Sequence, residues 1–249
     1  MRLFPLIGLL FLLVGCEASS REIAQRVEYA LPCSIQAGGT TIGGGVVLGP
    51  FMDAPQCALL TARHVVTYNR EYLHSISIVF ADRSEVSLGS TKDVWLTVPD
   101  KSVDCAWLLL DGVDTQRLTS GFTDYKIPVC IGSTPVKDDV MLIVNARDRH
   151  SCRYVEELAI KDVPFDKNLT FREATLRVGI VDVATEESES GSPVFKIINR
   201  CASLVGTTSI SRKAPDGTGY IALPNVLPSI SSSILGEEVH RLVDFPDLW

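Results

Sequence analysis

The chain has 249 residues, 46% of them hydrophobic, and a formal net charge of −7 at neutral pH. This length favours one unit with a large core over several independent domains. The acidic balance argues against nucleic acid as a partner, because that partner attracts positively charged surfaces.

The first 15 residues carry one charge, Arg2, followed by an apolar run from Leu3 to Val14. The run is shorter than the roughly 18 to 20 apolar residues of a membrane-spanning helix, so residues 1–15 are expected to be a secretory signal peptide. The small residue and Cys16 directly after it resemble a bacterial lipobox, in which the cysteine is acylated and becomes the new N-terminus. Acylation would anchor the protein in the bacterial cell envelope, on the periplasmic side or the cell surface, with residues 16–27 as a tether. The alternative is an ordinary signal peptide cleaved nearby.

The body of the chain consists of short apolar or alternating segments separated by Gly, Pro, Asp and Asn, which is typical of strands and turns. A first group of strands is predicted at 28–36, 41–48, 58–61, 75–80, 86–88 and 106–110. A second group is predicted at 140–145, 153–160, 174–183, 193–198, 203–209 and 219–222. Few helical patterns interrupt them. The sequence therefore predicts an all-β fold of two six-stranded antiparallel β-barrels, 28–113 and 127–249, joined by a linker at 114–126.

Two short helices are also expected. One helical turn should follow His64, within residues 65–70, because the chain leads away from a strand end there. A short C-terminal helix is expected between residues 226 and 242, where Leu235, Val239 and Leu242 recur at helical spacing.

A polar turn, Glu187-Ser-Glu-Ser-Gly-Ser-Pro-Val-Phe195, runs directly into an apolar strand. Tightly wound backbone at such a turn can hold a serine hydroxyl beside consecutive amide groups that face a carbonyl oxygen. Ser190 is therefore the candidate nucleophile. The same residue types are also typical of an ordinary loop between two strands, so the interpretation depends on partners elsewhere in the chain.

Two upstream segments supply such partners. Thr-Ala-Arg-His-Val, residues 61–65, follows an apolar strand, and Val-Asp-Cys-Ala-Trp-Leu-Leu-Leu, residues 103–110, places Asp104 at the mouth of another. A core histidine and a strand-end cap are the alternative interpretations of His64 and Asp104. The chain order His64, Asp104, Ser190 is that of one known type of Ser-His-Asp triad and differs from two others.

Together the three blocks resemble the signatures of the chymotrypsin-like (trypsin-like) serine peptidases, most closely the bacterial Deg/HtrA type and the glutamyl endopeptidases. The resemblance runs from about Tyr29 to near Pro228. It implies an active site between the two barrels, where Ser190 attacks a carbonyl, His64 transfers the proton and Asp104 orients the histidine. It also implies an oxyanion hole made by the backbone amides of Ser188 and Ser190.

The resemblance further assigns the contacts to substrate. The segment 204–209 looks like the family strand that pairs with an extended peptide, so Ser209 would contact Asp104, and Ile210 and Ser211 would offer backbone hydrogen bonds. The floor of the primary specificity pocket would lie near Ala184, six residues before the nucleophile. No carboxylate stands there, so we expect a small or medium apolar side chain to be preferred over Lys or Arg.

Two positions depart from the family pattern. Ser188 stands where the family usually has glycine, and its Cβ disfavours backbone with positive φ. Glu189 stands where digestive members have an aspartate that pairs with a newly cut N-terminus. Acylation of Cys16 would block that amine, so Glu189 is expected to face water or to pair with a cation such as Arg147 or Arg149.

The sequence has seven cysteines, including Cys16. In an exported protein the others could form disulfides, with Cys152–Cys201 as one candidate pair. No Cys-x-x-Cys pair is present and the histidines are scattered, so neither a metal site nor a cofactor is expected.

These features predict a cell-envelope serine endopeptidase that acts on protein or peptide substrates. The alternative is a pseudoprotease that keeps the barrels and binds peptides but lacks a formed oxyanion hole, as Ser188 suggests. An esterase using the same site is a third possibility.

Overall fold

The computed structural model describes residues 25–51, 57–67, 76–88, 94–97, 103–110, 127–131, 134–160, 176–198, 201–209, 217–222 and 239–241. Within these ranges the chain is almost entirely β-strand, with one short α-helix, α1 (Arg63–Thr67), and one 3-10 helix, η2 (Glu187–Glu189). The helical turn expected after His64, within residues 65–70, is present but begins earlier, at Arg63, and includes His64 itself; residues 68–70 lie outside the described residues.

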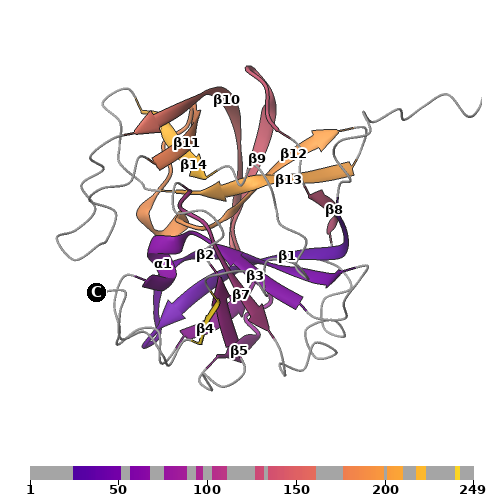
Figure 1. Cartoon of the computed structure of the whole chain (residues 1–249), viewed down its shortest axis with the longest axis vertical. Coiled ribbons are helices and arrows are strands. Elements are labelled where there is room, and N and C mark those ends of the chain that lie inside the picture. Colours follow the sequence, from indigo (N-terminus) through magenta and orange to yellow (C-terminus); the bar gives the residue numbers. More distant parts are fainter. Residues whose placement is uncertain are drawn as a thin grey trace, which may run out of the picture.

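The N-terminal barrel is an antiparallel sheet whose strands run in the order β5-β4-β1-β2-β3-β7-β6 (Figure 1). Its strands are β1 (Gln25–Ala37), β2 (Thr40–Phe51), β3 (Cys57–Thr61), β4 (Ile76–Phe80), β5 (Glu85–Ser87), β6 (Val94–Thr97) and β7 (Ala106–Leu110). A further strand, β15 (Val239–Arg241), pairs with the edge strand β6. In the described part of the chain this sheet does not close on itself.

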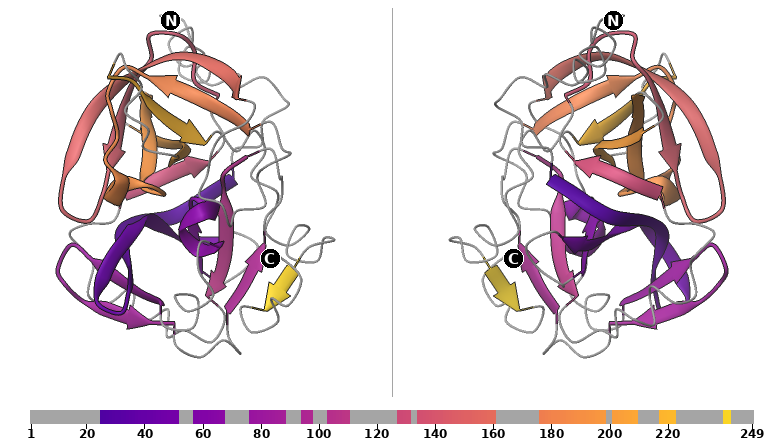
Figure 2. Two further views of the ribbon diagram at one scale, coloured as in Figure 1. Left: turned by 90° about the vertical axis from the view of Figure 1, so that its left-hand side faces the viewer. Right: turned by 90° about the vertical axis from the view of Figure 1, so that its right-hand side faces the viewer.

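The C-terminal barrel is a closed ring of six antiparallel strands, β12-β9-β10-β11-β14-β13, in which β13 pairs back with β12. The ring strands are β9 (Val140–Val144), β10 (Arg149–Ile160), β11 (Leu176–Val181), β12 (Pro193–Ile198), β13 (Cys201–Thr208) and β14 (Gly219–Ala222). The connecting strand β8 (Ile127–Ile131) pairs with β1 on one side and runs parallel to β13 on the other. Figure 2 shows the two barrels stacked one on the other. The predicted all-β, two-barrel architecture is confirmed.

The strand β3 shows how the two barrels are packed together. All five of its residues are buried, and the first four alternate between two hydrophobic clusters. Cys57 and Leu59 point into the N-terminal barrel, whereas Ala58 and Leu60 belong to a cluster that also contains Phe195 and Leu204 of the other barrel. Successive side chains of a strand face opposite sides, so one strand can line a barrel interior and the junction between barrels.

The predicted elements differ from the structure in several places. Residues 239–241, where the C-terminal helix was expected to end, form strand β15, so that expectation is wrong for this part of the chain. Apolar residues three or four apart fit a helix, but the backbone of residues 239–241 pairs with the edge strand β6 instead. The short strands β6 and β8 were not predicted.

The expected tether overlaps the fold, since β1 already begins at Gln25. Cys16, the signal peptide and the linker 114–126 lie outside the described residues. Among the residues that are described, no helix has the length and apolar character needed to span a bilayer.

Candidate active site

Ser190 lies in a compact turn between β11 and β12. The turn begins with η2, in which the Glu189 N–H donates to the Glu186 carbonyl at 3.0 Å. Gly191 follows with φ +91°, a conformation that side chains with a Cβ rarely adopt. The chain then enters β12 at Pro193. This turn presents Ser190 on tightly wound backbone, as the sequence predicted.

The turn is seated against the N-terminal barrel through glycines. The Gly44 N–H donates to the Ser190 carbonyl at 2.7 Å. A Cβ on Gly43 would lie 2.6 Å from the same carbonyl oxygen and 2.7 Å from Val65 Cγ2. The residue after His64 and the backbone of Ser190 therefore converge on one glycine, which brings helix α1 and the turn together.

Gly191 makes the second close approach. A Cβ there would lie 2.3 Å from the Gly44 carbonyl oxygen and 2.3 Å from Thr61 Oγ1, at the end of β3. The Thr61 hydroxyl donates to the Gly44 carbonyl at 2.7 Å, which ties β3 to β2 at this point. The three consecutive glycines 43–45 were not singled out from the sequence, although glycine inside a strand marks a close approach of backbone.

Thr208, at the end of β13, fastens the other side of the turn. Its carbonyl accepts from the Gly191 N–H at 2.8 Å, and its own N–H donates to the Ser192 carbonyl at 2.8 Å. Its hydroxyl accepts from the Ser192 N–H at 3.0 Å and donates to the Glu189 carbonyl. Sequence reasoning did not identify this role, because it depends on how β13 pairs with β12.

His64, Asp104 and Ser209 are joined by hydrogen bonds. The His64 ring Nδ1 lies 2.7 Å from Asp104 Oδ2, and the His64 backbone N–H donates to Asp104 Oδ1 at 3.0 Å. The Ser209 hydroxyl donates to Asp104 Oδ2 at 2.6 Å, so the contact predicted between these two residues is present. Asp104 therefore fixes both the backbone and the ring of His64, and Nε2 is the ring nitrogen that could exchange a proton with a nucleophile.

Asp104 is fully buried, so its protonation state depends on the groups that contact its carboxylate. Burial by itself would raise the pKa of the carboxyl group, but the charge of His64 and the hydrogen bonds from His64 and Ser209 outweigh burial and lower that pKa. The carboxylate is therefore ionised at neutral pH and can stabilise an imidazolium on His64.

The predicted oxyanion-hole position, Ser188, is exposed and forms the middle of η2. Among the described non-glycine residues, only Arg83 and Asp138 have positive φ, so Ser188 does not adopt the left-handed backbone that favours glycine. The backbone of Ser188 is part of the 3-10 helix instead.

Ala184, expected near the floor of the specificity pocket, lies in the segment that leads from β11 to η2. The start of β14 packs against this segment. A Cβ on Gly219 would lie 2.4 Å from the Val183 carbonyl oxygen and 3.1 Å from Thr185 Cγ2. The other two predicted substrate contacts, Ile210 and Ser211, lie outside the described residues.

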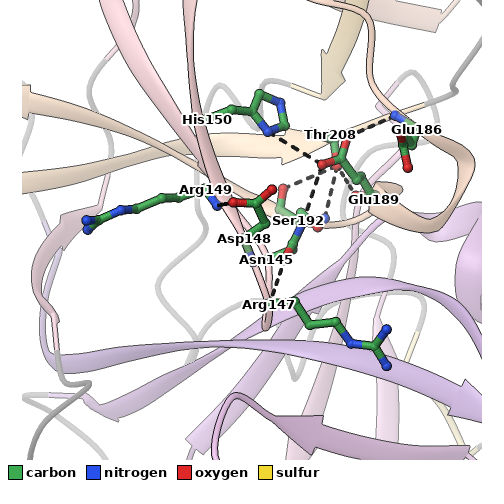
Figure 3. A network of polar contacts seen from close by, with 9 residues as sticks. All are labelled: Asn145, Arg147, Asp148, Arg149, His150, Glu186, Glu189, Ser192 and Thr208. Atoms are coloured by element: carbon green, nitrogen blue, oxygen red, sulfur yellow. Dashed lines mark hydrogen bonds and ion pairs between the residues drawn. The ribbon is translucent and has the colours of Figure 1, made fainter.

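Glu189 is buried and its carboxylate contacts neither of the expected arginines. Its oxygens accept from the Glu186 N–H at 2.9 Å and the Asn145 amide at 3.4 Å, and one lies 3.6 Å from His150 Nδ1. Figure 3 shows the guanidinium groups of Arg147 and Arg149 directed away from it. The hairpin between β9 and β10 therefore supplies an amide and an imidazole in place of an arginine.

The expected disulfide between Cys152 and Cys201 is not formed, because Cys152 is a buried free thiol. Its side chain belongs to the core of the C-terminal barrel, with Met141 and Val205. Burial, together with the nearby Asp182, raises the pKa of Cys152 to about 12. Cys33 and Cys105 are likewise buried free thiols.

No family model and no curated protein matches this sequence. The protease domain of MamO from Magnetospirillum magneticum is 14% identical, with a TM-score of 0.51 over 83% of this chain and 96% of that chain. The active form of the Rv3671c protease from M. tuberculosis is 14% identical, with a TM-score of 0.49 over 83% of this chain and 79% of that one. The NS6 protease of murine norovirus 1 is 13% identical, with a TM-score of 0.46 over 79% of this chain and 92% of the viral one. The likeness to the MamO domain shows that this chain has the chymotrypsin-like fold of serine and cysteine proteases.

Proposed function

We propose that this protein is a serine endopeptidase of the bacterial cell envelope, with Ser190 as nucleophile, His64 as general base and acid, and Asp104 as the orienting carboxylate. One observation carries the proposal. The buried carboxylate of Asp104 is bonded to His64 and Ser209, next to the turn that holds Ser190. The protease fold supports peptides as the substrate class.

The proposed reaction begins when the Ser190 hydroxyl attacks a peptide carbonyl and passes its proton to His64 Nε2. The imidazolium is stabilised by Asp104 across the 2.7 Å contact at Nδ1. Collapse of the tetrahedral intermediate transfers that proton to the leaving amine and leaves an acyl group on Ser190. Water, deprotonated by His64, then releases the second product and regenerates the serine.

The hydrolysis of an unfolded protein tests the proposal. Ser190→Ala should abolish cleavage of reduced casein and labelling by a fluorophosphonate, because both need the hydroxyl. Ser192→Ala is the matched control, since its hydroxyl is buried two residues away and has no hydrogen-bond partner in the described part of the chain. Equal labelling of the parent and Ser190→Ala would rule the proposal out.

The envelope location rests on Cys16, which follows the apolar run 3–14. An acyl chain contributes roughly 0.8 kcal/mol of membrane affinity per buried methylene, so acylation could hold the protein at a membrane. Expression of the full sequence with a clickable palmitate analogue should label the processed protein that begins at Cys16, and Cys16→Ser should lose the label and release the protein from the membrane fraction. Labelling that survives Cys16→Ser would contradict the anchor.

The winding of η2 favours one other function, a pseudoprotease that binds peptides without cleaving them. Ser188 lies inside this 3-10 helix, where its amide is not set by the positive-φ backbone that glycine would allow. Such a protein would bind extended peptides equally well with and without the Ser190 hydroxyl and would not react with fluorophosphonate. Reaction of the parent chain at Ser190 would exclude this function.

A further inference from the structure

Glu189 lies where the turn that carries Ser190 meets the β9–β10 hairpin (Figure 3). One of its carboxylate oxygens faces the turn and the other faces the hairpin. The first accepts from the Glu186 N–H at 2.9 Å, and the second receives the Asn145 amide at 3.4 Å, with His150 Nδ1 at 3.6 Å. The carboxylate thus connects two segments that are about 40 residues apart in the chain.

On the turn side, Glu189 stabilises η2 directly. Glu186 directly precedes the helix, and Glu189 is the third residue of the helix. The Glu189 side chain therefore reaches back and accepts a hydrogen bond from the Glu186 N–H at the helix start. A glutamate at this position satisfies an amide that has no partner within the helix, as in a capping box. The Glu189 N–H meanwhile donates to the Glu186 carbonyl, so the two residues are bonded reciprocally.

On the hairpin side, Asn145 is held in one orientation. Its Oδ1 accepts from the N–H groups of Arg147 and Asp148 at 2.8 and 2.6 Å, and its own N–H donates to the Asp148 carbonyl at 2.9 Å. The oxygen of this amide is therefore committed to the hairpin turn. The nitrogen is the group left to face Glu189, where it acts as a donor.

The Asn145 amide and the His150 ring are the two hairpin groups that face the buried carboxylate. Glu189 is only 8% exposed, and a buried carboxylate that loses its partners is strongly destabilised. While Asn145 and His150 face the Glu189 carboxylate, its buried position is stabilised. The wound form of the turn, η2, is then stabilised as well. If the hairpin side no longer offered a donor, the side chain would move toward water and η2 would lose its cap.

The wound turn also affects Ser190. In a 3-10 helix each carbonyl points along the axis toward the amide three residues on, so the peptide between Glu187 and Ser188 directs its oxygen toward the Ser190 end of the turn. An oxyanion hole at Ser188 and Ser190 needs amide hydrogens, not a carbonyl oxygen, at that place. The turn must therefore unwind, at least at Glu187 and Ser188, before both amides can bind an oxyanion.

We propose that η2 is a latch and that Glu189 is the positioning residue that keeps it closed through Asn145 and His150. The latch sets the fraction of molecules whose oxyanion hole is formed, and the hairpin controls it. This inference rests on the proposed peptidase activity of Ser190. It places regulation at residues 145–150 of the β9–β10 hairpin.

A swap of donor and acceptor tests the latch. Asn145→Asp keeps the oxygen that the hairpin turn needs but presents a second carboxylate oxygen to Glu189. Glu189→Gln can still accept from the Glu186 N–H, but its own amide then faces the amide of Asn145. In the double variant Asn145→Asp/Glu189→Gln the Gln amide can donate to the new aspartate, so the link is restored with its polarity reversed. Arg147→Ala is the control, since its side chain points away from Glu189 (Figure 3).

The readout is the second-order rate of fluorophosphonate labelling, with kcat and KM for a peptide substrate and thermal unfolding as a check of folding. Each single variant should label about ten-fold faster than the parent, bounded by the roughly 10²- to 10³-fold that one oxyanion donor is worth. The gain should appear in kcat, and the double variant should return toward the parent rate. Arg147→Ala should match the parent.

Single variants that fold and label at the parent rate or more slowly would overturn the latch, as would a double variant that fails to reverse the singles. Either variant suffices if the other does not fold. A different result bears on the peptidase proposal itself. If the parent and all folded variants react no faster than Ser190→Ala, the proposed activity fails, and the latch fails with it.

Discussion

The two halves of the candidate site hold their buried carboxylates in different ways. Asp104 receives three contacts of 3.0 Å or less, from the backbone and ring of His64 and from the Ser209 hydroxyl. Glu189 receives one contact of this quality, from its own turn, while Asn145 and His150 approach only to 3.4 and 3.6 Å. Good hydrogen bonds from nitrogen are shorter than about 3.2 Å, so only Asp104 is firmly fixed. The acid–base half of the site is therefore held rigidly at its carboxylate. In the other half, Gly44 and Thr208 fasten the turn by short hydrogen bonds, and only the hairpin side of the Glu189 carboxylate is held by longer contacts.

The largest effect is expected from the rigid half. Asp104→Asn should lower kcat by about 10⁴-fold, as the same change does in a Ser-His-Asp triad, because the amide stabilises the wrong tautomer of the histidine. Asp182→Asn is the control, since its side chain is exposed and keeps an acceptor for the Arg153 N–H. Peptide hydrolysis near neutral pH measures the effect. A loss of less than ten-fold in folded Asp104→Asn would mean that His64 does not depend on this carboxylate.

A smaller but still large effect is expected where the turn meets the N-terminal barrel. Gly191→Ala places a Cβ 2.3 Å from the Gly44 carbonyl oxygen on backbone with φ +91°, so the turn must shift. We expect a loss of stability of about 2 to 4 kcal/mol from strain and overpacking, and loss of fluorophosphonate labelling.

Gly217→Ala is the matched control for that change. Its φ is +79°, but no atom of the described residues lies within 4 Å of the added Cβ. Only the backbone strain of about 1 to 2 kcal/mol should remain, with labelling unchanged. Equal effects of the two substitutions in urea unfolding would show that the close approach at Gly191 does not matter.

The Ser209 hydroxyl gives an intermediate effect that depends on pH. Because the pKa of Asp104 is lowered by folding, its ionised form stabilises the protein fully above the unfolded value of about 3.9, and this stability is lost as pH falls through the folded pKa. Ser209→Ala removes one of the hydrogen bonds that lower this pKa. The acid limb of stability should therefore move to higher pH, with a loss of about 1.5 to 3 kcal/mol at neutral pH. Urea unfolding from pH 3 to 7 measures it, and an unchanged acid limb would contradict the assignment.

The smallest effect is expected at the thiols. Cys33, Cys105 and Cys152 are buried, and burial raises the pKa of each thiol, so the reactive thiolate is scarce. Iodoacetamide near neutral pH should leave them unmodified in the folded protein and leave peptidase activity unchanged. Mass spectrometry after modification in urea supplies the control. Rapid native alkylation of Cys105, next to Asp104, would show that the rigid half opens more readily than its contacts suggest.

More of the rigid half than of the nucleophile half could be predicted from the sequence, because the turn and Ser190 were predicted but the groups that contact Glu189 were not. His64 and Asp104 each stand beside a five-residue, mostly apolar strand, so the local pattern locates them, and the succession of short strands predicts both barrels. Strands β6 and β15 were not predicted, because segments of four and three residues are too short to show a strand-like alternation of apolar and polar residues. The contacts of Glu189 with Asn145 and His150 were not predicted either, because these residues are brought to the turn by the pairing of β9 with β12. The glutamate was expected near residues 147 and 149, but the direction of side chains in a hairpin is fixed by its register.

The central claim is that Ser190 reacts as an acyl-transfer nucleophile activated by His64. Mass spectrometric mapping of the fluorophosphonate adduct, on the parent and on His64→Ala, tests it most directly. The account predicts one adduct, on the peptide that contains Ser190, and its loss in folded His64→Ala. An adduct on another residue, or an adduct at Ser190 that forms equally fast without the imidazole, would contradict it.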